Sequence, residues 1–177
     1  MKQKIRALAE YIFTIKIIRR LIRSIINLNN LISRAWSFIR VRALLEVPTG
    51  SSAHWSTEYK YPQNITLRGR VMISPDCVLG ARSPISIGNE VRLSQGVHIE
   101  TASLDLKSGL PYKHISKPIV IGDGVWIGAH SIILGGVTIG ANSIIGAGVT
   151  VSKNVPENSI LVGAPTRNIN FKETYHQ

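Results

Sequence analysis

Histidine and cysteine are the side chains of this 177-residue chain that most often carry acid–base, nucleophilic or metal chemistry. The chain holds five histidines and a single cysteine, Cys77. No two of them have the HxxxH or CxxC spacing typical of metal sites, and a lone thiol excludes an intrachain disulfide. The sequence therefore predicts no metal and a reducing, cytoplasmic compartment.

The net charge of +11 is concentrated at one end of the chain. Residues 1–47 hold ten Lys/Arg against two Glu, a net charge of +8, whereas residues 48–177 carry only +3. The eleven aromatic residues do not alternate with basic ones as a base-stacking surface requires, and no helix-turn-helix, zinc-finger or RNP-like motif is present. The charge pattern therefore argues against a nucleic-acid partner.

Residues 1–47 are predicted to form a basic amphipathic helical segment. Ile and Leu recur every three or four residues over 5–28, and the basic residues of 16–23 occupy the other side. A break is expected at Asn27, Asn29 and Asn30. No run reaches the ~18 uncharged residues of a membrane span, and no signal-peptide pattern is present.

Two interpretations of this segment stay open. In the first, it lies on an anionic membrane surface, which would make the protein peripheral on the inner face of the membrane. In the second, it packs on the rest of the chain or on neighbouring subunits, with its basic residues solvated. The sequence does not decide between them.

The centre of the chain is a six-residue repeat. Residues 121–156 divide without insertion into IGDGVW, IGAHSI, ILGGVT, IGANSI, IGAGVT and VSKNVP, and six more hexads cover 67–84 and 87–104. Every hexad begins with Ile, Leu or Val, and its fifth residue is Val, Ser or Cys. Short β-prone runs between Gly, Asn or Asp turns predict a three-faced β-solenoid with about eighteen residues per coil. Twelve hexads predict about four coils, with the N-terminal helix helping to cap one end.

The repeat sets the expected boundaries of the other segments. Residues 48–66 are predicted as a linker, residues 67–156 as the solenoid and residues 157–177 as a C-terminal extension. The hexads are interrupted between Leu104 and Ile121. Residues 105–118 (DLKSGLPYKHISKP) are therefore expected to leave the solenoid as a protruding loop.

The hexads resemble those of the hexapeptide-repeat acyltransferases, most densely over SKPIVIGDGVWIGAHSIILGGVTIGANSIIGAGVTVSKNVPENSILVGAP at 116–165. The likeness is greatest to galactoside and maltose acetyltransferases and to O-acetyltransferases of bacterial exopolysaccharides such as colanic acid. It implies a mainly β fold, a left-handed parallel β-helix, and a homotrimer in which the loop of one subunit reaches over the next. It also implies acetyl transfer from acetyl-CoA to a sugar hydroxyl in surface polysaccharide assembly.

The same resemblance implies which residues bind acetyl-CoA. Ala129 and Ala147 are small enough to let the pantetheine arm lie along the coil, although tight solenoid turns alone would also explain them. Ser152 and Lys153 occupy the slot that the family often fills with Thr-Lys. Arg167, after the GAP turn, suits a CoA phosphate as a bidentate donor.

The position at which the family carries its catalytic histidine is Leu104 in this chain. The family pattern is Thr, one or two small residues and His, whereas residues 101–104 read TASL. Three alternatives follow. In the first, the chain is a non-catalytic relative that serves as a binding or scaffold subunit. In the second, His114 in the loop is the substitute base, with Asp105 as an orienting or substitute carboxylate. In the third, transfer relies on proximity and oxyanion stabilisation without a base.

Two other side chains have weaker claims to a role. His98 is expected on a neighbouring face of the solenoid and is the less favoured base. Trp126 ends a hexad and is interpreted as a subunit-interface or cofactor-side aromatic, with simple packing as the alternative.

Overall fold

The computed structural model describes residues 2–163 and 167–170, and the side chains of residues 15–163. The chain divides into two compact units, residues 1–36 and 37–177. Helix α1 spans Lys2–Leu44 and includes all of the described part of the first unit, while the solenoid lies in the second.

Helix α1 is continuous over 43 residues, so the predicted break at Asn27, Asn29 and Asn30 is wrong. The chain has no Gly or Pro before Pro48. An Asn in a helix interior costs only ~0.7 kcal/mol relative to Ala, which lowers propensity without stopping the helix. Within the described part of the chain, no helix is long and apolar enough to cross a membrane.

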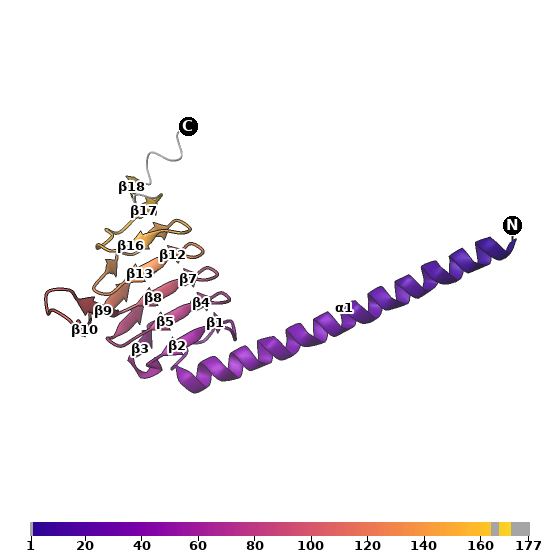
Figure 1. Ribbon diagram of the computed structural model, residues 1–177, viewed down its shortest axis with the longest axis horizontal. Coiled ribbons are helices and arrows are strands. Elements are labelled where there is room, and N and C mark those ends of the chain that lie inside the picture. The colour runs from indigo at the N-terminus through magenta and orange to yellow at the C-terminus, as the bar shows by residue number, and fades with distance from the viewer. Residues whose placement is uncertain (1, 164–166, 171–177) are drawn as a thin grey trace. The chain divides into compact units, whose positions relative to one another are not determined.

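The solenoid in the second unit is built from short strands, which stack coil upon coil into three sheets, one for each face (Figure 1). The seven-stranded sheet contains, in spatial order, β1 (Ser52–Ala53), β4 (Val71–Ile73), β7 (Val91–Leu93), β12 (Trp126–Ile127), β15 (Ile144–Ile145), β17 (Ser159–Val162) and β18 (Arg167–Asn170). The five-stranded sheet contains β2 (Glu58–Lys60), β5 (Val78–Gly80), β8 (His98–Glu100), β13 (Ile132–Leu134) and β16 (Thr150–Val151). The four-stranded sheet contains β3 (Ile65–Leu67), β6 (Ile85–Ile87), β11 (Ile119–Ile121) and β14 (Thr138–Ile139).

Successive strands of each sheet belong to successive coils and pair in parallel, as the repeat predicts. β7, for example, pairs in parallel with β4 below it and with β12 above it. Only β18 departs from this rule among these sheets, because it turns back antiparallel to β17. The hexad pattern therefore correctly predicts a mainly β, parallel solenoid.

The solenoid has about six turns rather than the predicted four, because it extends beyond the recognisable hexads at both ends. Residues 48–66, predicted as a linker, carry β1, β2 and a 3₁₀ turn at Pro62–Asn64, and β3 begins at Ile65. After residue 156, β17 adds a further parallel strand. Ala53 and Thr57 are buried in the first coil. They fill inward positions without the large aliphatic side chain that made the later repeats visible.

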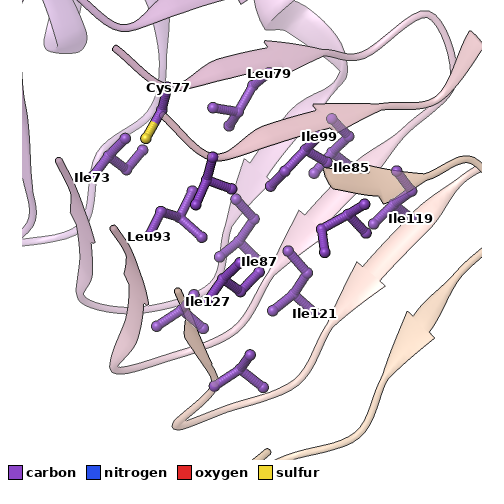
Figure 2. Packing of buried hydrophobic residues seen from close by; sticks show 14 of the residues in the cluster. Ile73, Cys77, Leu79, Ile85, Ile87, Leu93, Ile99, Ile119, Ile121 and Ile127 are labelled. Carbon is purple, nitrogen blue, oxygen red and sulfur yellow. The ribbon is translucent and has the colours of Figure 1, made fainter. Parts of the chain in front are cut away.

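The core explains the hexad. In most strands, the fifth residue of one hexad and the first of the next point inward and flank an outward residue, as in β4, where Val71 and Ile73 are buried and Met72 is exposed. Figure 2 shows such side chains directed into a common interior, among them Ile99 from the five-stranded sheet and Ile87 and Ile121 from the four-stranded sheet. Two hexads depart from this pattern. In 79–84 the fifth residue, Ser83, is half-buried, and Ile85 and Ile87 take the inward positions of β6. In 99–104 the fifth residue, Ser103, is exposed because the chain has already left the coil.

The end of α1 caps the first coil, as expected. Val41 and Leu45 are 4% and 6% exposed and belong to the same apolar cluster as the solenoid core. Arg40 also donates a hydrogen bond from Nη1 to the carbonyl oxygen of Trp55. These contacts cover aliphatic side chains that have no preceding coil to cover them.

Shortening a core side chain should destabilise the stack. Ile133 is fully buried in β13, whereas the adjacent Ile132 points outward and is 39% exposed. We expect Ile133→Ala to lower the free energy of unfolding by about 3 kcal/mol through lost burial and a cavity. Urea denaturation followed by circular dichroism measures this. Ile132→Ala is the matched control, and an equal loss in both variants would contradict the inward assignment.

Candidate active site

The interruption of the repeat is a β-hairpin that protrudes from the stack (Figure 1). β9 (Ala102–Asp105) and β10 (Lys113–Ser116) pair antiparallel and form a separate two-stranded sheet. The hairpin begins at Ala102, three residues before the predicted loop. The chain then rejoins the solenoid at Ile119, in register with Ile85 of the coil below.

Thr101 anchors the base of this hairpin. It is fully buried, and its Oγ1 donates to the carbonyl oxygen of Gly80 (2.8 Å) and accepts from the backbone N–H of Ser83 (3.0 Å). The N–H of Lys117 on the returning strand donates to the Thr101 carbonyl oxygen (3.0 Å). A hydrogen bond of 2.7 Å joins the hydroxyls of Ser83 and Ser116. Sequence reasoning missed this role, although a hydroxyl residue just before the interruption was a usable signal.

The hairpin places His114 directly opposite Leu104. The two residues are register partners of β10 and β9, and both side chains are exposed. Partnered residues of an antiparallel pair project from the same face, with Cβ atoms ~5 Å apart. A histidine therefore stands one cross-strand position away from Leu104, the position at which the resemblance predicts a catalytic histidine.

Asp105 lies on the other face of the hairpin, because side chains alternate along a strand. Its register partner is Lys113, and its Oδ1 accepts the backbone N–H of Lys107 (3.0 Å). Its carbonyl oxygen also accepts from the Ser108 hydroxyl (2.8 Å), which stabilises the turn. Among the described side chains, Asp105 and His114 share no hydrogen bond or ion pair, so the structure does not bring this predicted pair together.

Ser152 and Lys153 lie at the same edge of the five-stranded sheet as the hairpin base, two coils above it. Thr101, Gly135 and Lys153 each follow their strand of this sheet (β8, β13 and β16), and these strands pair in register through Glu100 with Leu134 and Ile133 with Val151. Two coils correspond to a rise of ~10 Å. The stacking is tight, since a Cβ on Gly135 would lie 2.5 Å from the Thr101 carbonyl oxygen. Both candidates are exposed and line a hollow of about 490 Å³ with Thr150, Pro156 and Leu161 among its other walls.

Ala129 and Ala147 lie at the opposite edge of the same five-stranded sheet. They precede β13 and β16, respectively, whereas Ser152 and Lys153 follow β16. The Gly148 N–H donates to the Ala129 carbonyl oxygen (2.8 Å), so the two alanine turns stack directly. Arg167 is in β18 opposite Val162. Its side chain lies outside the described residues.

The remaining candidates lie apart from the hairpin. His98 projects from β8, where its Nε2 is 4.0 Å from a Glu100 carboxylate oxygen. Trp126 is 52% exposed on the seven-stranded sheet, and its Nε1–H donates to Ser94 Oγ (3.0 Å). Its outward neighbours in register are Arg92 and Ile144, beside a separate hollow of about 390 Å³.

The single cysteine is a core residue. Cys77 is fully buried, and burial raises the pKa of its thiol. A buried thiol held in its protonated form is a poor nucleophile. Among the described residues, no three His, Cys, Asp or Glu side chains gather in a way that could hold a metal ion.

Comparison with known proteins matches the repeat to one family model and to several relatives. Residues 118–153 match the model described as bacterial transferase hexapeptide (six repeats). Nodulation protein L of Rhizobium meliloti is 33% identical over 134 residues, which cover 75% of this chain and 73% of that protein. An acetyltransferase-type protein of Schizosaccharomyces pombe is 32% identical over 113 residues, and the match spans 63% of this chain but only 55% of that protein's length.

Solved structures share the fold. A hexapeptide-repeat acetyltransferase of Vibrio cholerae, determined in complex with acetyl coenzyme A, is 30% identical with a TM-score of 0.64, covering 72% of this chain and 70% of that one. A maltose O-acetyltransferase of Clostridium difficile is 34% identical with a TM-score of 0.62, covering 73% and 71%.

Removing the hydroxyl at the hairpin base should cost stability. Thr101→Val keeps the shape of the side chain but leaves the Gly80 carbonyl oxygen and the Ser83 N–H without this partner. We expect the free energy of unfolding to fall by about 1–3 kcal/mol, measured by urea denaturation. Thr138→Val, at an exposed outward position of β14, is the control. Equal stability of the Thr101 variant and the wild type would contradict the anchoring role.

Proposed function

Because the chain belongs to the hexapeptide-repeat acetyltransferase family, we propose that it transfers an acetyl group from acetyl-CoA to a hydroxyl group of a sugar. The solenoid supplies a rigid frame, and the hairpin and the Ser152–Lys153 hollow supply the chemistry. The Vibrio cholerae relative bound to acetyl coenzyme A supports the donor. The maltose O-acetyltransferase relative supports a sugar acceptor.

The pairing of Leu104 with His114 is the observation that carries this proposal. A leucine cannot accept a proton, so the reaction needs a base from elsewhere. His114 is exposed on the same face of the hairpin as Leu104, and imidazole is the side chain that most often acts as a general base. It therefore reaches the region from which the usual histidine would act, although it comes from the other strand.

The proposed reaction is direct acyl transfer. An imidazole nitrogen of His114 removes the proton of the acceptor hydroxyl as its oxygen attacks the thioester carbonyl carbon. The tetrahedral intermediate collapses with cleavage of the carbon–sulfur bond. The CoA sulfur then takes the proton from the imidazolium, which restores the neutral base. Asp105 faces away from His114 in this hairpin, so we assign it to the turn and not to the proton path.

We further propose that the active unit is a homotrimer with sites between subunits. One chain places Ala129 and Ala147 at one edge of the five-stranded sheet and the hairpin, Ser152 and Lys153 at the other edge. A long donor such as acetyl-CoA would contact both sets if a second subunit brought its alanine edge against the first subunit's hairpin edge. Lys153 suits a CoA phosphate as a flexible cation.

The resemblance to exopolysaccharide O-acetyltransferases makes a surface polysaccharide precursor our proposed acceptor class. A scaffold or binding subunit without catalysis is the competing function, favoured by Leu104 alone. The Vibrio cholerae and Clostridium difficile relatives are acetyltransferases, which supports the enzymatic alternative.

Replacing His114 should abolish most of the turnover. We expect His114→Ala to lower kcat at least about 100-fold, the usual contribution of a general base, with little change in KM for acetyl-CoA. The measurement is CoA release from acetyl-CoA with a panel of oligosaccharide acceptors.

Leu104→His is the complementary variant. In the proposed mechanism, it restores turnover when combined with His114→Ala, because the new imidazole comes from the neighbouring strand position. An inactive wild type that binds CoA and gains turnover from Leu104→His alone would instead establish the non-catalytic alternative. Full activity of His114→Ala would exclude His114 as the base.

Lys153 should contribute to donor affinity. We expect Lys153→Ala to raise the Kd for acetyl-CoA about 10-fold, the typical loss for a charge-assisted contact, measured by calorimetric titration. Lys60→Ala removes the same charge from β2, at the other end of the same sheet, and should leave the affinity unchanged. Equal weakening by both variants would point to net charge and contradict a direct contact.

A further inference from the structure

The N-terminal unit carries an exposed apolar surface that the proposed acetyl transfer does not use. Ten large apolar side chains between residues 15 and 36 are 41–66% exposed in α1, namely Ile17, Ile18, Leu21, Ile22, Ile25, Ile26, Leu28, Leu31, Ile32 and Trp36. Large exposed apolar patches usually mark a protein or membrane contact. Something other than water should therefore cover this face.

The helix separates its apolar and basic side chains completely over these residues. At ~100° per residue, the apolar side chains occupy an arc of ~220°, and Lys16, Arg19, Arg20, Arg23 and Arg34 span ~100° within the remaining ~140°. This separation is only possible because α1 continues through residues 27–30. A break there would have disconnected the two apolar stretches.

Two arginines lie at the borders between these arcs. On the helical projection, Arg19 is ~20° from Ile26, and Arg20 is ~20° from Leu31. Border arginines can bury their methylene groups beside the apolar face while their guanidinium groups extend toward phosphates. The basic arc therefore begins immediately where the apolar arc ends, on both sides.

The charge of the segment selects an anionic partner. Residues 11–45 contain seven Lys/Arg and no Asp or Glu, and no ion pair involves the described side chains of residues 15–36. Packing copies of this helix together would bring like charges close without any acidic residue to compensate them. An anionic lipid surface compensates the charge and covers the apolar arc at the same time.

We propose that residues 15–36 of α1 bind the surface of an anionic lipid bilayer, with the helix in the plane of the interface. The apolar arc enters the boundary between headgroups and acyl chains, and the border arginines contact lipid phosphates. The helix does not span the bilayer, in agreement with its hydropathy. Such binding would hold the solenoid beside lipid-linked acceptors, but it does not depend on the proposed acetyl transfer.

Vesicle sedimentation with the full chain tests this proposal. We expect wild type to sediment with vesicles of equal parts phosphatidylcholine and phosphatidylglycerol, to remain free with phosphatidylcholine alone, and to be released by high salt. Arg19→Gln with Arg20→Gln should weaken binding roughly 30-fold, at about 5-fold per basic residue. The matched control is Arg68→Gln with Arg82→Gln, which removes two exposed charges from the solenoid and should bind as wild type does.

A second pair of variants separates burial from charge. Ile22→Gln with Ile25→Gln should abolish vesicle binding, whereas Asn27→Gln with Asn30→Gln, on the basic arc, should not.

No sedimentation of wild type with anionic vesicles, or equal weakening by both arginine pairs, would overturn the proposal. So would concentration-dependent assembly that requires Ile22 and Ile25 without lipid binding, because the apolar arc would then be covered by further copies of the chain. CoA release measured on the same samples reports the proposed activity separately.

Discussion

The solenoid depends on one constraint, which is that no coil can cover its own aliphatic side chains. Each inward residue is covered by the equivalent residue of the coils above and below, as Ile121 is by Ile87 and Ile139, its register partners in adjacent strands. A slip of one residue would turn inward side chains outward. The stack therefore fixes the backbone register of every coil, and the two ends need covers of their own. Val41 and Leu45 provide the cover at the first coil.

A fixed register also fixes what lies outside. Outward residues one coil apart stand directly above one another, so Trp126 meets Arg92 and Ile144. The protruding hairpin fits into this frame because the chain returns in register at Ile119 and because Thr101 satisfies the polar groups at the point of departure. A hairpin on such a base is held by the whole stack.

Helix α1 obeys a different rule from the solenoid. Its side chains repeat every 3.6 residues and separate by polarity around an axis, whereas solenoid residues separate by alternation along short strands. Aliphatic side chains thus form a buried core in the solenoid but an exposed apolar arc on α1. The exposed apolar arc of α1 therefore needs an external partner to cover it.

The sequence by itself determined the parallel solenoid, the inward positions, the protruding segment and the amphipathic helix, because each is a local period that side-chain chemistry makes visible. The sequence underestimated the number of coils, since Ala53 and Thr57 fill inward positions without a large aliphatic side chain. It also predicted a break in α1 at asparagines that a long helix tolerates. Tertiary structure alone decided which residues meet. His114 faces Leu104, and Asp105 faces away from both, because antiparallel register depends on where the hairpin turns. That Lys153 lies at the same edge of the five-stranded sheet as Thr101, two coils above it, depends on how many residues each coil has between its strands, which no local period records.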